Sequence, residues 1–386
     1  MAQRRRPHLL YYSCEQIPRK QAPQASLPLN LYLSCESSAA GLPNLPYSCE
    51  TKLTTPYLRP VLTFFRSTQA YAGLPFLLYA LALQLPVFFG GAAVPTEATT
   101  GHGIFGNYLS NYAVAHPWQA VALPVVLMGI LALQASVLSN RHNLTRSATQ
   151  LAALGVLLAW GLTPGFRILH PAMLANIFLL FALLSVGKVY KNQYPQIALF
   201  NAGAWLALAS ILAPGYLLFF LPLYIAGGVL GRTGLAELLR LLTGVFVLYF
   251  LVGTFAYFYG FLPEFLAAQT PLFSYDLIPA APLPLAFAGV LAVLALLLIT
   301  QLNNIVRVIN IEGNKGVTIL FWVLLFTPLV ILFGGGISIT STATLIVPVG
   351  ILLGLALHNL PERAAELAHL LLAVGALLVA ALGFLQ

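Results

Sequence analysis

The 386-residue sequence is 59% hydrophobic and only 7% charged, and its mean hydropathy is +0.88. Soluble domains carry about 25% charged residues, so these values exclude a water-soluble protein. The net charge of +8 does not point to a nucleic-acid partner, because the basic residues are scattered through loops on one side of the expected membrane spans.

Residues 1–60 differ from the rest of the chain because they are polar and too weakly hydrophobic to fold alone. They contain a short repeat, LYYSCE, LYLSCE and LPYSCE, which holds the three cysteines Cys14, Cys35 and Cys49. An odd number of cysteines without a CxxC pattern favours neither a disulfide framework nor a zinc site. We interpret this tail as translation from a start codon placed too early, and we expect the mature chain to begin near Val61.

The remaining sequence, residues 61–386, predicts a single transmembrane domain of the all-α class. Apolar runs of about 20 residues follow one another, and each is long enough to cross a bilayer as a helix. We expect about eleven spans, at residues 72–90, 118–138, 149–166, 168–187, 197–213, 215–231, 236–260, 283–302, 316–335, 340–359 and 366–385.

The distribution of Lys and Arg predicts the orientation of these spans, because basic loops favour the cytoplasm. With the N-terminus inside, only Arg167 of the 18 basic residues falls outside, and the C-terminus is then also outside. The same rule favours two spans over one kinked span at residues 197–231. A single span would place Arg232 and Lys315 on the side opposite Lys188.

Two expected external loops, 91–117 and 261–282, contain most of the charged residues on that face. The external set consists of Glu97, His102, His116, Arg167, His170, Glu264 and Asp276. One interpretation is a site for a phosphate-bearing lipid, with Glu97 as a catalytic base and with His102, Arg167, His170 and Asp276 binding the substrate. The other interpretation is a set of solvated loop charges, in which His170 and Pro171 simply begin a helix.

Several shorter patterns have structural explanations. GHGIFG at 101–106 matches a dinucleotide motif by spacing but lacks its strand and helix, so we expect a flexible loop and a chance match. The GxxxG pairs at 227–231 and 350–354 predict close packing of helices. Polar amides in or near spans predict hydrogen bonds between helices, with ligand contact as the second interpretation: Gln84, Gln134, Asn176, Asn201 and Gln301.

Three stretches of the chain resemble an uncharacterised polytopic inner-membrane family of Gram-negative gliding and gut bacteria, a domain of unknown function. The resemblance rests on FFRSTQAYAGLPFLLYALALQLPVFF at 64–89, HPAMLANIFLLFALLSVGKVYKNQ at 170–193 and FNAGAWLALASILAPGYLLFFLPLYIAG at 200–227. It covers most of residues 61–260 and implies a multi-pass protein of the bacterial inner membrane. Some labels in this family say β-carotene oxygenase, but the seven histidines are too dispersed to converge on iron.

A more distant likeness is to the membrane region of polyprenyl-phosphate-sugar glycosyltransferases, which share a long first external loop followed by helix pairs with short loops. That likeness implies an acidic catalytic residue in the first external loop, where Glu97 is the match. We therefore expect a protein that handles envelope lipid or lipid-linked sugar on its outer face, without a metal or cofactor. The second hypothesis is a transporter or a non-catalytic assembly subunit.

Overall fold

The computed structural model describes residues 61–66, 73–90, 103–163, 167–190, 192, 194–270, 310–333 and 341–382, and the statements below concern these residues. They contain helices and no strand, which confirms the all-α class. The elements are α1 (Val61–Arg66), α2 (Gly73–Gly90), α3 (Ile104–Ala115), α4 (Pro117–Arg141), α5 (Leu151–Gly161), α6 (Pro171–Gly187), α7 (Pro195–Leu212), η2 (Pro214–Phe219), α8 (Phe220–Val229), α9 (Leu235–Phe258), α10 (Leu262–Gln269), α12 (Ile311–Phe333), η3 (Ser341–Leu345), α13 (Ile346–Asn359) and α14 (Glu362–Leu382).

Five of these helices, α4, α7, α9, α12 and α14, are long and apolar enough to cross a membrane. Shorter apolar helices occupy Leu74–Phe89, Leu151–Gly161, Pro171–Gly187, Pro214–Val229 and Ala343–Asn359. Each expected span overlaps one of these helices except 283–302, which lies outside the described residues. The chain is therefore a helical membrane protein. Helix α5 ends earlier than expected because Pro164 follows, and a residue before proline is disfavoured in helical conformation.

The chain reverses direction between α7 and α8. Ala213, which precedes Pro214, has an extended backbone with φ −141° and ψ 100°. After the turn, the Arg232 guanidinium donates to the carbonyl of Asn192 at 3.3 Å, beside the start of α7. The start of α7 and the end of α8 thus lie at the same end of the bundle, as expected for two passages rather than one kinked helix.

The two expected external loops contain helices α3 and α10, so the prediction of a flexible loop at 101–106 was wrong for its described part. The Gly103 amide donates to the Leu212 carbonyl at 3.1 Å. A Cβ on Gly103 would meet the Ile211 carbonyl oxygen well inside 3.0 Å. The glycine therefore serves a close approach to the end of α7, and Ile104 begins α3 directly after it.

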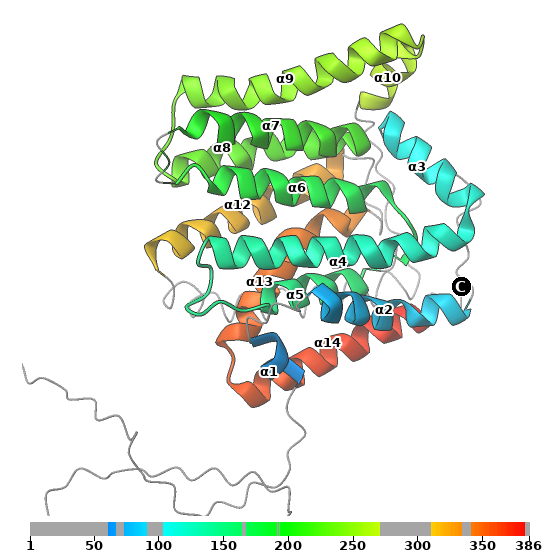
Figure 1. The fold of residues 1–386 in the computed structure, drawn as a ribbon, viewed down its shortest axis with the longest axis vertical. Coiled ribbons are helices and arrows are strands. Elements are labelled where there is room, and N and C mark those ends of the chain that lie inside the picture. The colour runs from blue at the N-terminus through cyan, green and yellow to red at the C-terminus, as the bar shows by residue number, and fades with distance from the viewer. Residues whose placement is uncertain are drawn as a thin grey trace, which may run out of the picture. The chain divides into compact units, whose positions relative to one another are not determined.

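Neighbouring helices α4, α6, α7 and α9 follow one another across the bundle, with α5 and α13 packed beside them (Figure 1). Every residue of α5 is buried, so this helix is at the core. Its Gly155 faces Gly350 and Gly354 of α13, where an added Cβ would lie 2.5 Å from the Gly354 nitrogen. The GxxxG pair at 350–354 thus packs helices as predicted. The pair at 227–231 does not, because Gly231 has φ +87° and follows the end of α8.

The predicted interhelical amides have different surroundings. Gln84 is buried and its Nε2 donates to the Arg167 carbonyl at 2.8 Å. Gln134 is buried with neither amide atom bonded among the described residues, whereas Asn201 is exposed and Gln301 lies outside them. Asn176 is fully buried and joins three elements. Its Nδ2 donates to the Ala343 carbonyl at 3.0 Å, and its Oδ1 accepts from the Tyr216 hydroxyl at 2.8 Å.

We expect Asn176→Ala to lower the free energy of unfolding by about 2 kcal/mol, because it leaves the Tyr216 hydroxyl and the Ala343 carbonyl buried without their partner. Thermal unfolding of the purified protein in detergent measures this. Asn201→Ala is the matched control on the exposed side of α7 and should change stability by no more than about 0.5 kcal/mol. Equal effects of the two substitutions would contradict the bridging role of Asn176.

The charged residues that the structure describes gather at one end of the bundle, which we call the charged end. It comprises the ends of α4, α6 and α8 and the beginnings of α7, α9, α12 and α14, and it carries Arg66, Arg141, Arg146, Lys188, Arg232, Glu237, Arg240, Glu312, Lys315, Glu362, Arg363 and Glu366. At the opposite end, Arg167 and Glu264 are the charged residues in the described part of the chain. Charge is thus strongly asymmetric along the helix axes.

Candidate functional site

The predicted external site is only partly described. Glu97, the predicted catalytic base, and His102 and Asp276, two predicted substrate-binding residues, lie outside the described residues. Arg167 and His170 are described, and so are His116 and Glu264. His116 lies between α3 and α4, where its ring is 4.6 Å from that of Tyr112. The structure therefore places individual members of the cluster without assembling it.

His170 caps the first turn of α6. Its backbone is extended and its Nδ1 accepts a hydrogen bond from the Ala172 amide at 3.2 Å, while Pro171 takes the first helical position. A helix start leaves several amides without backbone partners, and a side-chain acceptor satisfies one of them. This is the role expected from the second interpretation of the His170 and Pro171 pair.

Arg167 binds backbone carbonyls of three helices. Its Nη2 donates to the Ala376 carbonyl of α14 at 2.7 Å and to the Gly161 carbonyl at the end of α5 at 3.0 Å. Its Nη1 approaches the Leu83 carbonyl of α2 at 3.4 Å. Burial lowers the pKa of the Arg167 guanidinium to about 10, so the side chain stays charged at neutral pH. The guanidinium thus links α2, α5 and α14 through their backbone carbonyls, a set of contacts that we call the Arg167 clasp.

An apolar groove lies between η2 and α9. It has a volume of about 540 Å³ and is lined by Leu217, Leu239, Leu242, Thr243, Val245, Phe246 and Tyr249. Helix α9 is the most exposed of the five long apolar helices, with only 11% of its apolar window buried. Because the exposed side chains around the groove are apolar except for Thr243, the groove faces the surface that lipid chains contact in a membrane.

A polar network adjoins this groove through Tyr249. The Tyr249 hydroxyl lies 2.8 Å from Ser210 Oγ and donates to Gln269 Oε1 at 3.2 Å. The Gln269 amide in turn donates to the Ile211 carbonyl at 3.3 Å. These residues come from α7, α9 and α10 near the end opposite the charged end. Tyr249 therefore belongs both to the lining of the groove and to this polar network.

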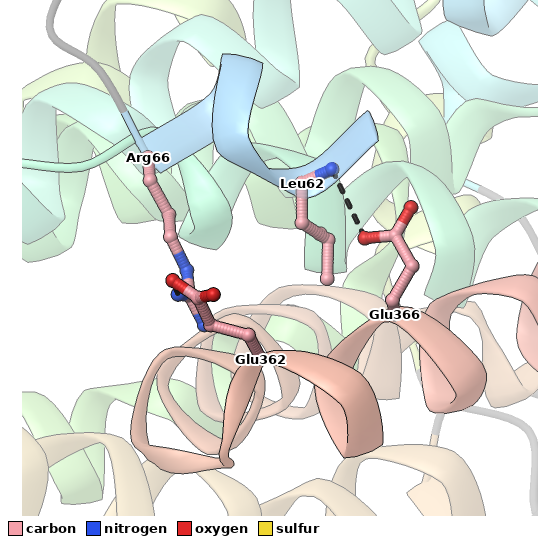
Figure 2. Close-up of polar contacts among 4 residues, drawn as sticks. All are labelled: Leu62, Arg66, Glu362 and Glu366. Carbon is pink, nitrogen blue, oxygen red and sulfur yellow. Dashed lines mark hydrogen bonds and ion pairs between the residues drawn. The ribbon is translucent and has the colours of Figure 1, made fainter. Parts of the chain in front are cut away.

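A second polar feature joins α1 to α14, as Figure 2 shows. Arg66 forms an ion pair with Glu362, with Nη1 and Oε1 3.1 Å apart, and Glu366 accepts from the Leu62 amide at 3.2 Å. One turn further along α14, His369 is buried and its Nε2 lies 3.0 Å from the Tyr79 hydroxyl of α2. We call Glu362, Glu366 and His369 the α14 polar face.

Sequence reasoning did not identify the α14 polar face. Its members are four and three residues apart, which places them on one side of a helix. This spacing was the available signal, but 366–385 was interpreted only as an apolar span. The partners Arg66 and Tyr79 are distant in the sequence, so their contacts could not be deduced from it.

His142 forms a third small site at the charged end. It follows α4, and its ring fits against Gly187 of α6, where an added Cβ would collide with it. Burial and the neighbouring Arg141 lower the pKa of the His142 imidazole, and Glu312 opposes this effect. Within the described residues, no group of three or more His, Cys, Asp or Glu side chains could hold a metal ion.

Comparison with known proteins adds no family to these observations. No protein-family model matches the chain, and neither the curated proteins nor the solved structures yield a significant match.

Proposed function

We propose that this chain is a multi-pass protein of the bacterial inner membrane that binds an envelope lipid or a lipid-linked sugar, with the lipid chain in the α9 groove. The observation that carries the proposal is the groove itself, which is mostly apolar along α9 and is also lined by Tyr249, a member of the network with Ser210 and Gln269. Its volume is in the range of roughly 300–1,000 Å³ that is usual for small-molecule sites.

The charge asymmetry supports an orientation with the charged end in the cytoplasm, because Lys and Arg near span ends favour that side. Tyr249 and its polar network then lie toward the outer leaflet, where the headgroup of a lipid substrate is accessible. Eleven spans remain our proposal. The residues on either side of the expected span 283–302 support this number. Thr270 follows Gln269, which bonds to Ile211 near the end of α7, whereas Asn310 precedes α12 at the charged end, so the two lie at opposite ends of the bundle.

The occupant proposed for the groove is a polyprenyl phosphate or its sugar conjugate. A long apolar chain fits a surface lined by Leu217, Leu242 and Phe246, and its attraction to the groove comes from van der Waals packing, because lipid tails are as apolar as these side chains. The Gln269 amide has a second N–H beyond the one donated to Ile211, and this N–H can donate to polar headgroup atoms. The role of Glu97 as the base of a transfer reaction stays a prediction, as does the resemblance to glycosyltransferase membrane regions.

Native mass spectrometry of the protein purified gently from its own membrane tests this proposal. We expect the wild-type protein to retain about one polyprenyl lipid per chain. Leu242→Trp should reduce that occupancy at least about tenfold, because the indole fills part of the groove. Leu251→Trp is the matched control, since Leu251 is exposed on α9 but does not line the groove.

Two outcomes would contradict lipid binding in the groove. One is equal retention of the polyprenyl lipid by the Leu242→Trp and Leu251→Trp proteins. The other is a wild-type protein that carries only bulk phospholipid.

The second candidate function is a transporter, and the α14 polar face favours it. Ionisable side chains inside membrane helices are costly to bury and commonly mark the path of an ion or a substrate. His369 is 6% exposed within α14 and hydrogen-bonded to Tyr79 of α2.

A further inference from the structure

We propose that His369 is a proton-binding site within the helix bundle, held by Tyr79 and tuned by the carboxylate of Glu366. The inference does not depend on the α9 groove and goes beyond lipid binding. It rests on three observations, namely the burial of His369, its hydrogen bond to Tyr79 and the graded exposure of the α14 polar face.

The α14 polar face leads from water to the interior. The Glu362 side chain is 74% exposed at the charged end, Glu366 is half-buried, and His369 is only 6% exposed. Each member is one helical turn deeper than the previous one. Ionisable residues in such a series shorten the distance that a proton crosses without a group to bind it. The series begins at the charged end, so we expect protons to reach His369 from that end.

The groups that face His369 come from each helix packed near it. Helix α2 contributes the Tyr79 hydroxyl, and α5 has no titratable side chain. The ionisable groups on the other two neighbouring helices interact elsewhere among the described residues, since Arg66 of α1 pairs with Glu362 and its charge acts on His358 of α13. On α14 itself, Glu366 is the nearest carboxylate along the helix. Its carboxylate lies three residues from His369 on the same helix face, where a negative charge favours an imidazolium.

Protonation reverses the direction of the hydrogen bond between Tyr79 and His369, and the hydroxyl hydrogen of Tyr79 turns away from the ring. In the neutral ring with a bare Nε2, the Tyr79 hydroxyl donates to that nitrogen. When a proton from water at the charged end binds Nε2, the new N–H donates to the Tyr79 oxygen, and the site gains one positive charge. Glu366 then has two groups that favour its carboxylate, the imidazolium and the Leu62 amide of α1. Proton binding is thereby linked to the attachment of α1.

Nuclear magnetic resonance of the full chain, with ¹⁵N-labelled histidine in lipid nanodiscs, tests this inference between pH 5 and 9. His369→Gln identifies the resonance, and Tyr79→Phe identifies it independently because it removes the hydroxyl bonded to the ring. We expect His369 to titrate within this range. Glu366→Gln should lower its midpoint by about one pH unit, because it removes the favourable charge while keeping an acceptor for the Leu62 amide.

Glu362→Gln is the matched control on the same helix face, and its greater distance and exposure should make its shift clearly smaller. Glu264→Gln, at the opposite end of the bundle, should leave the midpoint unchanged. A His369 ring that stays neutral from pH 5 to 9 overturns the proposal. A midpoint that Glu366→Gln leaves in place, or moves no further than Glu362→Gln does, also overturns it.

Discussion

Gly155→Ala should lower the free energy of unfolding by about 3 kcal/mol or more. The new Cβ would lie 2.5 Å from the Gly354 nitrogen of α13 and still closer to the Gly350 carbonyl oxygen. Both obstacles are backbone atoms, which cannot rotate away as a side chain does. Helices α5 and α13 must therefore separate, and α5 is the helix buried over its whole length.

Thermal unfolding monitored by size-exclusion chromatography measures this effect, and we expect the Tm to fall by roughly 5–10 °C. Gly253→Ala on α9 is the matched control, because the nearest atom to its Cβ is Phe265 Cε1 at 4.0 Å. That substitution should be neutral or slightly stabilising, since alanine favours a helix over glycine by about 1 kcal/mol. A Gly155→Ala protein as stable as Gly253→Ala would show that α5 and α13 do not approach as closely as described.

Arg167→Lys should destabilise the protein by about 3 kcal/mol and so separate the two roles considered for this residue. The guanidinium donates to carbonyls of α2, α5 and α14 from two different nitrogens, and hydrogen bonds to charged groups contribute about 1.5–3 kcal/mol each. A lysine ammonium is one compact point and cannot reproduce that planar arrangement. The loss should appear in thermal unfolding whether or not lipid is present.

Arg240→Lys provides the matched control for this substitution. Arg240 is one third exposed and pairs with Glu237 on the same helix at 3.2 Å, so its replacement should change stability by less than about 0.5 kcal/mol. If Arg167 instead binds the phosphate of a lipid, Arg167→Lys would unfold at the wild-type temperature and lose only the bound lipid. That result would contradict the clasp and restore Arg167 to the predicted substrate site.

The predicted substrate site shows where single-sequence reasoning stops. Arg167 is unusual in the sequence because it is the one basic residue that the expected spans place outside. Its charge suggests an anionic ligand, and in the structure its guanidinium contacts three helix carbonyls. Those carbonyls belong to residues from three different helices, so no local pattern could reveal them. Glu97, His102 and Asp276 lie outside the described residues, so their proposed roles stay predictions.

The α14 polar face shows the same limit from the opposite side. Glu366 and His369 are visible in the sequence with helical spacing, but their importance depends on what α1 and α2 place beside them. Arg66 and Glu362 meet across 296 positions of the chain, and Tyr79 and His369 across 290. A charged residue that is solvated in a loop cannot be distinguished in the sequence from one that has a buried partner, because the partner is known only once the helices are packed.

The sequence by itself determined that this is an all-helical membrane protein with its charge collected at one end. Long apolar runs have no other stable form in lipid, because the backbone must satisfy its own hydrogen bonds, and few charges could be placed within them. Only the tertiary structure decided which residues become partners. Close approach at Gly155, the clasp of Arg167 and the pairing of His369 with Tyr79 all depend on helices distant in sequence, whose relative placement comes from side-chain packing across the whole bundle.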